Sequence, residues 1–406
     1  MTEILLYILR LFIYSLLAIF IFNSLYILIY AIAGLKKQKE ILTPDSYIKR
    51  KFAIFIPSYK EDNIIIDTAI NSIKQTYPSE YYDVFIIADK LQPETIQTLK
   101  SLPIKVIEVN FDKSTKSKSL NYAMNEAGDN YDIALILDAD NIMETTFLEK
   151  VNLCFENGCR IVQGHRLAKN LNTTIALLDG ISEEINNHIF RKGHRALGLS
   201  SALIGSGMAF EYKLYKNYMA NVHSVGEDKE LEFHLLRDNL KIEYEQSALV
   251  YDEKVQHPDS FTNQRRRWIN AQLACLRDNA IIGFKKFFLE GNIDLLNKVL
   301  QMIILPRILL LGSTFIFTFL LFCLFLLKVL SFNILLLGIS ILTATALSLI
   351  ISVPLKFYNT KTLKALLYIP KGFLLMLTAL LKIKGAGKQF IHTPHGVKSD
   401  VTNKQE

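Results

Sequence analysis

The chain has 406 residues, of which 50% are hydrophobic and 21% are charged, and its mean hydropathy is +0.22. This composition excludes an intrinsically disordered chain, a collagen and a small disulfide-rich scaffold, and the length predicts two or three structural units. The 46 lysines and arginines outnumber the 39 aspartates and glutamates, which gives a net charge of +7. The positions of these basic residues explain the excess without a nucleic-acid partner.

Three charge-free stretches, residues 11–35, 308–327 and 329–355, are long enough to cross a bilayer, which takes about 20 apolar residues. The first lacks the basic leader and small-residue cleavage site of a signal peptide, so it predicts a retained anchor. Basic residues gather just after it, at 36–51, and again after the third stretch, at 356–364. Because basic residues favour the cytoplasmic side, we expect the polar block between the spans to lie there.

A fourth apolar segment, residues 365–381, is shorter and contains Pro370 and Lys371. If it spanned, the lysines that follow would be exported, against the charge rule, so we expect an interfacial helix on the cytoplasmic face. The alternative is a further span. The expected organisation is an anchor over 1–35, a cytoplasmic domain over 36–290, a C-terminal membrane region over 291–384 and a cytoplasmic tail over 385–406.

From residue 52 onward, short apolar runs alternate with amphipathic stretches of helix length. Four runs predict strands, at residues 52–57, 83–88, 105–109 and 133–137. Three stretches predict helices, at residues 62–76, 92–101 and 117–127. Strands that are nearly all apolar and alternate with helices predict an α/β fold with a parallel sheet covered on both faces. Ligands of such sheets bind beyond the carboxyl ends of the strands.

Acidic residues follow three of the four predicted strands. Glu61 stands after the first, Asp89 after the second, and Asp138 and Asp140 after the fourth. Asp138 and Asp140 are two residues apart, so in an extended chain both carboxylates point to one side. Oxygen pairs of this kind suit Mg²⁺ or Mn²⁺, which in turn hold phosphate oxygens. Taken alone, the pair is more simply interpreted as a solvated loop with two acids.

Short motifs follow one another between about residues 50 and 270. In chain order they are Pro57-Ser-Tyr59-Lys-Glu61, Asp89, Lys116 followed by Leu120 and Asn121, Asp138-Ala-Asp140, Gly205-Ser206-Gly207, Gly226-Glu227-Asp228 and Gln264-Arg-Arg-Arg267-Trp268. Their order and spacing resemble a membrane-integrated family 2 glycosyltransferase of the GT-A fold, similar to cellulose and hyaluronan synthases. The last motif is the most specific, because Q-x-x-R-W distinguishes the membrane synthase-like branch from soluble relatives. The first motif departs from the family's P-x-Y-N-E, because Lys60 replaces the asparagine.

The resemblance implies a role for each motif. It implies contacts with a nucleotide-sugar donor at Pro57, Tyr59, Glu61, Asp89, Lys116, Asp138, Gln264 and Arg267. It implies a divalent metal, Mg²⁺ or Mn²⁺, held by Asp138 and Asp140. It implies acceptor contacts at Gly205, Ser206, Gly207, Glu227 and Trp268, and it makes Asp228 the general base.

These roles imply sugar transfer with inversion at the anomeric carbon, because one base and direct displacement suffice. The metal and Arg267 would neutralise the leaving diphosphate, and UDP is the family's usual nucleotide. We therefore expect a multi-pass enzyme of the bacterial inner membrane whose catalytic domain, residues 36–290, is cytoplasmic. Its acceptor would be lipid-linked or a glycan, and an export or synthase protein is a candidate partner.

Alternatives to simple transfer remain open. A processive synthase that translocates its polymer is favoured by Q-x-x-R-W and by residues 390–395, which resemble the family's F-x-V-T-x-K gating loop with His395 in place of the lysine. Three spans are few for a channel, and a plain polar tail explains 390–395 as well. A non-catalytic scaffold would not need Asp228. A secondary transporter would need broken helices and charges in its spans.

Two motifs also have simpler interpretations. The three arginines at 265–267 could form a basic stripe that binds lipid headgroups, although this does not explain Gln264 or Trp268. The acids at 227–228 could simply precede a helix over 229–239, where negative charge favours the helix start.

Overall fold

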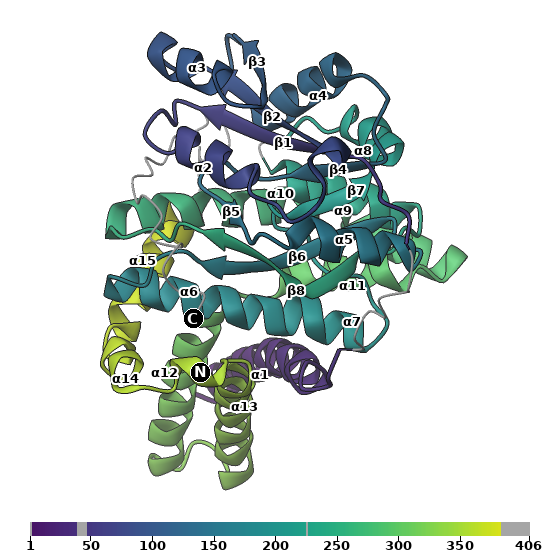
Figure 1. Ribbon diagram of the computed structural model, residues 1–406. Coiled ribbons are helices and arrows are strands. Elements are labelled where there is room, and N and C mark those ends of the chain that lie inside the picture. The colour runs from purple at the N-terminus through teal and green to yellow at the C-terminus, as the bar shows by residue number, and fades with distance from the viewer. Residues whose placement is uncertain (1, 39–46, 225, 383–406) are drawn as a thin grey trace.

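The computed structural model describes residues 2–38, 47–224 and 226–382. Figure 1 shows an α/β domain from which a group of apolar helices projects on one side. The gating-type motif at 390–395 and the tail over 385–406 lie outside the described residues and remain predictions.

One eight-stranded sheet organises the domain, in the order β3-β2-β1-β4-β7-β6-β8-β5. The strands are β1 (Phe52–Tyr59), β2 (Tyr82–Asp89), β3 (Lys105–Val109), β4 (Ile133–Ile136), β5 (Ile142–Met143), β6 (Ile161–Ala168), β7 (Met208–Glu211) and β8 (Glu243–Asp252). Strands β1 to β4 are parallel, whereas β7 is antiparallel to β4 and β6, and β5 is antiparallel to β8. Strands β6 and β8 pair in parallel with each other. The expected parallel direction is therefore correct for the first four strands and for β6 and β8, and wrong for β5 and β7.

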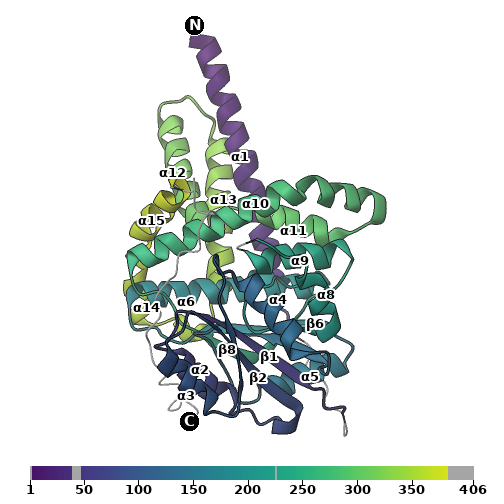
Figure 2. The ribbon, with the colours of Figure 1, turned by 90° about the horizontal axis from the view of Figure 1, so that it is seen from above.

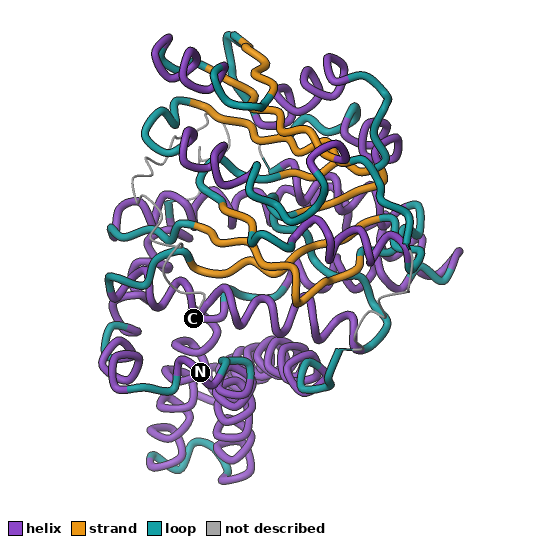
Figure 3. The backbone as a smooth tube through the Cα atoms, viewed as in Figure 1, coloured by secondary structure: helices purple, strands orange, loops and turns teal. Residues whose placement is uncertain are grey.

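Both faces of the sheet are buried, which explains why its first strands are apolar throughout. Alternate side chains of a strand point to opposite faces. On β1, Phe52, Ile54 and Ile56 belong to one core cluster, and Ala53 and Phe55 belong to the other. In Figure 3 the strands run through the middle of the domain with helices on either side. The face of Phe52 is covered by α2 (Ile65–Ser72), α3 (Pro93–Lys100) and α5 (Phe147–Glu156), and the opposite face by α4 (Lys116–Ala127), α8 (Tyr212–Met219) and α9 (Glu227–Arg237).

Most element boundaries lie within two residues of the prediction, but α2 is shorter than the expected helix over 62–76. Two contacts remove the chain from a helical path after Ser72. The Gln75 side chain donates to the Glu144 carbonyl at 3.0 Å, and the Thr76 amide donates to the Thr145 carbonyl at 2.8 Å. These long-range hydrogen bonds outweigh the local helical preference.

Among the remaining helices, η1 (Ser79–Tyr81) packs against β2, and the others lie between the domain and the apolar group or beside it. These others are α6 (Thr174–Asn186), η2 (Asn187–Gly193), α7 (His194–Ala196), α10 (Pro258–Glu290), α11 (Ile293–Ile303), η3 (Leu355–Phe357), α14 (Thr360–Leu366) and α15 (Ile369–Leu381). Three more, α1 (Thr2–Ala33), α12 (Arg307–Leu326) and α13 (Phe332–Ile351), are long and apolar enough to cross a membrane, as the sequence predicts. Figure 2 shows them on one side of the domain, with the N-terminal end of α1 farthest from it.

Helices α14 and α15 form a pair bent by 50°, which by length and composition is compatible with one broken span. The interfacial helix expected over 365–381 and its alternative, a further span, both remain predictions. Helix α15 packs against α10 and α12, so it lies beside the domain as well as beside the apolar group.

Polar contacts fix α1 to the domain. The hydroxyls of Tyr26 and Tyr30 donate to Asn297 Oδ1 of α11 at 3.0 and 2.7 Å, and the ring of His194 stacks on Tyr30 with 3.8 Å between centroids. Burial lowers the pKa of His194 to about 3, so this ring is neutral. Helix α1 is therefore joined to the domain by a neutral hydrogen-bonded cluster.

Candidate active site

A cavity of about 1750 Å³ extends from the carboxyl ends of β1, β2 and β4 to the apolar helices. Nearly every residue that the motifs indicate lines it. These are Pro57, Tyr59, Glu61, Asp89, Lys116, Asp138, Asp140, Gly205, Glu227, Asp228, Gln264, Arg267 and Trp268. Ser206 and Gly207 stand outside the lining. We call the part near β1, β2 and β4 the strand end of the cavity, and the part near α6, α12, α13 and α15 the helix end.

Sharp turns follow β1 and β2 at the strand end. Lys60 and Lys90 have φ values of 57° and 56°, in the left-handed region that residues other than glycine rarely adopt. The Lys60 amide donates to the Asp89 carbonyl at 3.1 Å, which links the two turns. The ammonium groups of both lysines lie 5.4 and 5.8 Å from the ring centroid of Tyr59. The strand end thus presents one aromatic ring together with two cations.

Asp89 is a buried carboxylate that the described part of the protein leaves unsatisfied. Asp89 is 2% exposed, and neither carboxylate oxygen forms a hydrogen bond of ordinary geometry among the described residues. Burial raises the pKa of Asp89, although the nearby Ser114 hydroxyl and Lys90 act to lower it. The buried hydroxyl of Ser58 also has no partner in the same part of the chain. Since unsatisfied buried polar groups are costly, a ligand that donates hydrogen bonds here would stabilise the site.

Lys116 connects the end of β4 with the start of α9. Its Nζ lies 2.5 Å from Asp138 Oδ1, 2.6 Å from the Gly205 carbonyl oxygen and 3.2 Å from Glu227 Oε1. Burial lowers the pKa of Lys116, but Asp138 and Glu227 outweigh it and raise the pKa above its usual value. The site therefore contains a permanent cation between its acidic groups.

The loop before β7 places Gly205 inside this cluster. Gly205 has a φ of +83°, and a Cβ there would lie 3.6 Å from Lys116 Nζ and 3.8 Å from Asp228 Oδ2. Gly207 has a φ of +62°, and a Cβ there would come within 2.9 Å of Val250 Cγ2. Both positions favour glycine for their backbone conformation, and Gly207 also for lack of space.

Ser206 supports the loop from below. It is fully buried, its Oγ accepts a hydrogen bond from the Asp138 amide at 2.9 Å and donates to Asn141 Oδ1 at 2.7 Å. Asn141 in turn donates to Asp140 Oδ1 and to Asp252 Oδ1, both at 3.0 Å. The glycine loop is thus joined to the pair of aspartates by hydrogen bonds.

Asp138 and Asp140 both line the cavity, but the described residues contain no group of three or more His, Cys, Asp or Glu side chains that could hold a metal. Mg²⁺ is usually bound by one or two carboxylates together with substrate phosphates, without an all-protein cage. The pair therefore fits a metal that completes its coordination with a bound phosphate ligand. Metal binding by Asp138 and Asp140, as expected from the sequence, therefore remains a prediction.

Glu227 and Asp228 are the first two residues of α9, which starts two residues earlier than expected. Asp228 Oδ1 accepts a hydrogen bond from the Lys229 amide at 2.9 Å, and Lys229 Nζ lies 3.9 Å from Oδ2. Burial raises the pKa of Asp228, but Lys229 and Lys116 outweigh it and hold the pKa below its usual value. Burial and the neighbouring Asp228 raise the pKa of Glu227. Asp228 is therefore ionised at neutral pH and able to accept a proton.

A buried ion pair holds α9 in place one turn after Asp228. Lys298 Nζ of α11 lies 2.6 Å from Glu232 Oε1, with both side chains at most 6% exposed, and Glu232 Oε2 accepts a hydrogen bond from the Leu203 amide at 3.2 Å. The position of Asp228 thus depends on α11 and on the segment before the glycine loop.

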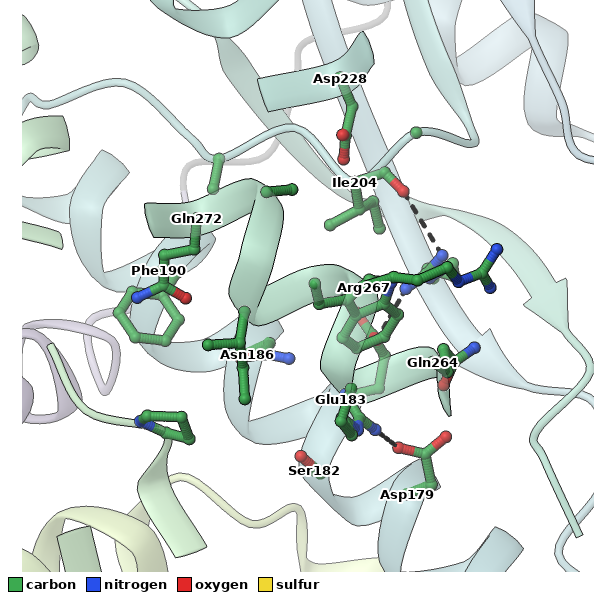
Figure 4. A pocket seen from close by; sticks show the side chains of 18 of the residues that line it. Asp179, Ser182, Glu183, Asn186, Phe190, Ile204, Asp228, Gln264, Arg267 and Gln272 are labelled. Atoms are coloured by element: carbon green, nitrogen blue, oxygen red, sulfur yellow. Dashed lines mark hydrogen bonds and ion pairs between the residues drawn. The ribbon is translucent and has the colours of Figure 1, made fainter. Parts of the chain in front are cut away.

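Helix α10 carries the Gln264–Trp268 motif along the cavity. Arg265 is ion-paired with Asp179 of α6, and its guanidinium lies 4.8 Å from the ring centroid of Phe261 and 4.2 Å from that of Trp268. Arg265 is therefore buried, and the headgroup-binding interpretation does not apply to it. In Figure 4, Asp228 and Asp179 lie on opposite sides of the pocket, with Arg267 between them.

A network of ion pairs near α6 joins residues that no sequence motif indicates. Arg166 Nη2 lies 2.9 Å from Glu183 Oε2, and Lys254 Nζ lies 2.6 Å from Asp252 Oδ2 and 3.6 Å from Glu183 Oε2. Burial raises the pKa of Glu183, but Arg166 and Lys254 hold it well below its usual range. Of these residues, only Asp252 could have been found from the sequence. It stands at the end of a strand, β8, in the same way as the acidic residues of the motifs.

Comparisons with known proteins agree with this arrangement. A family model described as "Glycosyltransferase like family 2" matches residues 49–271. The mannosyltransferase PcManGT from Pyrobaculum calidifontis, solved in complex with GDP-Man and Mn²⁺, is similar in structure: the TM-score is 0.50 at 14% identity, over 84% of this chain and 96% of that chain. At this identity the likeness is one of fold, and it confirms the expected GT-A architecture.

Two further solved structures match with lower scores. One is S. aureus TarS in complex with UDP, with a TM-score of 0.37 at 16% identity over 53% of this chain and 63% of that chain. The other is glucosyl-3-phosphoglycerate synthase from Mycobacterium tuberculosis with Mn²⁺, UDP and glucosyl-3-phosphoglycerate, with a TM-score of 0.38 at 14% identity over 56% of this chain and 80% of that chain. No curated protein matches the chain.

Proposed function

We propose, from the premise that this chain belongs to glycosyltransferase family 2, that it is an inverting enzyme that moves a sugar from a nucleotide-diphosphate sugar to a lipid-linked or glycan acceptor. The observation that carries the proposal is a single cavity that brings an ionised Asp228 together with Asp138, Asp140 and the unsatisfied Asp89. These are the groups that sugar transfer from a nucleotide requires at its base, metal and donor positions.

The donor nucleotide binds at the strand end in this proposal. Asp89 accepts hydrogen bonds from its base or ribose, since both carboxylate oxygens lack partners among the described residues. Tyr59 offers its ring, flanked by the ammonium groups of Lys60 and Lys90, to an anionic ligand with a flat ring. Pro57, Glu61 and Gln264 also line the cavity. UDP is the nucleotide that we expect.

The leaving diphosphate needs cations around it. A divalent ion, Mg²⁺ or Mn²⁺, bound by Asp138 and Asp140 would neutralise the charge that develops on the diphosphate. Two side chains of the protein add positive charge for the same purpose. They are Lys116, which lies between Asp138 and Glu227, and Arg267, which lines the cavity. Their positive charges favour the separated diphosphate over the intact donor.

Asp228 takes the proton from the acceptor hydroxyl as that oxygen bonds to the anomeric carbon. The bond between the anomeric carbon and the phosphate oxygen breaks in the same step, and its electrons leave with the diphosphate. Attack opposite the leaving group inverts the anomeric carbon. Trp268, Gly205 and Glu227 line the neighbouring space, which is where the acceptor sugar would lie.

The membrane arrangement follows from the apolar helices. We propose that α1, α12 and α13 span the bacterial inner membrane, with the GT-A domain, residues 36–290, on its cytoplasmic face. The C-terminal region over 291–384 would then bring the cavity to the membrane surface. The runner-up is a processive synthase; product length on a size column would distinguish it.

Release of nucleoside diphosphate tests the transferase proposal. Purified membranes carrying the chain would be offered a panel of UDP- and GDP-sugars with Mn²⁺ or Mg²⁺, in the presence of lipid extract as acceptor source. We expect metal-dependent release from one donor that Asp228→Asn abolishes and Asp112→Asn, an exposed control outside the cavity, leaves unchanged. Equal release by the wild type and Asp228→Asn would refute the assigned base.

A further inference from the structure

The helix end of the cavity differs chemically from the strand end. Its walls on the apolar helices are hydrocarbon: Ile308 and Leu311 of α12, Leu349 and Ile350 of α13, and Leu375 and Met376 of α15. A polysaccharide would need hydroxyl-binding groups along such walls, whereas a hydrocarbon chain would be stabilised by burial against them. This part of the cavity therefore suits an apolar ligand.

Arg307 stands where the apolar walls meet the polar part of the cavity. It is the first residue of α12, and its Nη2 donates to the carbonyl oxygen and the hydroxyl of Ser182 at 2.9 and 2.8 Å. Its Nη1 is buried without a hydrogen-bond partner in the described chain. Among the described residues no carboxylate forms an ion pair with Arg307, although the side chain lines the cavity.

The three acids of α6 are already engaged. Asp179 is paired with Arg265, Glu183 is shared by Arg166, Arg191 and Lys254, and Glu184 is shared by His165 and Lys356. A structural role for Arg307 as a clamp on α6 explains Nη2 but leaves Nη1 without a hydrogen bond beside an apolar space. Glu183 and Asp179 favour the charge of Arg307, yet neither forms an ion pair with it among the described residues. A buried guanidinium is unfavourable without an anion beside it, so an anionic ligand that pairs with Arg307 would stabilise the site.

We infer that Arg307 binds the phosphate of an amphiphilic acceptor, a sugar carried on a lipid phosphate or diphosphate whose hydrocarbon chain lies between α12, α13 and α15. The inference rests on the proposed function and names its acceptor class. The phosphate meets the guanidinium in a charge-assisted hydrogen bond, the chain fills the apolar part of the cavity, and the sugar end points toward Asp228.

Binding of short lipids to the whole chain in detergent tests this without any need for transfer, so it can succeed or fail separately from the proposed function. Trp268 is the only tryptophan of the 406 residues and lines the cavity, so its fluorescence reports occupancy. The probes are farnesyl phosphate, farnesol and inorganic phosphate. We expect the wild type to bind farnesyl phosphate about tenfold more tightly than farnesol, as one hydrogen bond to a charged group implies.

Arg307→Gln should reduce this preference to less than about threefold. Lys364→Gln, which removes an exposed cation of α14 outside the cavity lining, should leave it unchanged. If Arg307→Gln does not fold, as its unfolding midpoint would reveal, Arg307→Lys decides: it keeps the charge and should keep most of the preference. A folded Arg307→Lys without any preference would overturn the inference.

Three other results would also overturn it. Equal binding of farnesol and farnesyl phosphate by the wild type would remove the phosphate contact. Inorganic phosphate binding as tightly as farnesyl phosphate would show an anion site without a lipid. An undiminished preference in folded Arg307→Gln would assign the phosphate to another residue.

Discussion

The two ends of the cavity are built differently. At the strand end, Asp89 is the last residue of β2, Asp138 and Asp140 follow β4 directly, and the carboxylate of Asp89 lacks a hydrogen-bond partner in the described protein. At the helix end, charged side chains are paired across elements far apart in the sequence, as Arg265 is with Asp179. The strand end is thus prepared for a ligand, while most charges at the helix end hold the protein together.

This contrast separates two kinds of mutational effect. Substitutions at the strand end should reduce activity and leave stability almost unchanged, because the groups there contact ligands. Substitutions in the ion pairs of the helix end should reduce stability, because each leaves a buried charge without its partner. Each prediction below tests one side of this distinction.

The largest expected effect is that of Asp228→Asn on catalysis. We expect kcat to fall by about 10³-fold, within the range that general-base catalysis supplies, because the amide cannot accept the proton. The amide oxygen still accepts the Lys229 amide hydrogen bond, so the unfolding midpoint and the donor KM should stay near wild type. Steady-state kinetics and thermal unfolding of the same preparation check this. A variant that loses stability in proportion to its activity would contradict the separation.

The largest expected effect on stability is that of Asp179→Asn. It leaves Arg265 buried without its anion, which should cost about 4 kcal/mol of unfolding free energy. The double variant Asp179→Asn with Arg265→Met should recover much of the loss. The exposed pair of α10, Lys286 with Glu290, provides the control, and Glu290→Gln should cost less than about 0.5 kcal/mol. Denaturant unfolding in detergent measures all three, and equal losses for Asp179→Asn and Glu290→Gln would refute the assignment.

A smaller effect concerns the metal. Asn141 donates a hydrogen bond to Asp140 Oδ1 and accepts one from the Ser206 hydroxyl. It therefore helps to orient the carboxylate of Asp140. We expect Asn141→Ala to raise the Mn²⁺ concentration for half-maximal activity by about tenfold, as loss of a supporting partner does at other metal sites. Excess EDTA should abolish wild-type activity, and added Mn²⁺ should restore it. Activity that survives EDTA would exclude the proposed metal.

The smallest effect is a change in pH dependence. Burial raises the pKa of Asp228, and Lys229 is the largest of the causes that hold it below its usual value. Because Asp228 must be deprotonated to act, Lys229→Gln should move the acid limb of the kcat/KM profile to higher pH and leave the plateau near neutral pH intact. A movement of the limb to lower pH would contradict the sign.

The first four strands and the three apolar helices could be predicted because their signal is local. Strand β1 is buried on both faces, so every position from Phe52 to Ile56 is apolar. Strand β6 gave no such signal, because buried Gln163 and Arg166 stand in it and Gln163 donates to the Ser206 carbonyl at 3.0 Å. Its side chains serve the glycine loop and the ion-pair network, and a hydrophobic pattern cannot reveal that use.

The site shows the same division. The motifs identified the strand-end residues because each follows a strand within a few positions. The partnership of Arg265 with Asp179 joins residues 86 positions apart, and no spacing rule predicts it. Arg307 was hidden in the same way, because at the start of an apolar span a single arginine looks like an ordinary membrane-interface residue.

The destination of the transferred sugar tests the central claim most directly. Membranes carrying the wild type or Asp228→Asn would be incubated with Mn²⁺ and the labelled donor identified by diphosphate release, then extracted with chloroform and methanol. The account predicts label in the organic phase with the wild type and about 10³-fold less with Asp228→Asn. Label confined to a water-soluble polymer, or equal lipid labelling by both proteins, would contradict it.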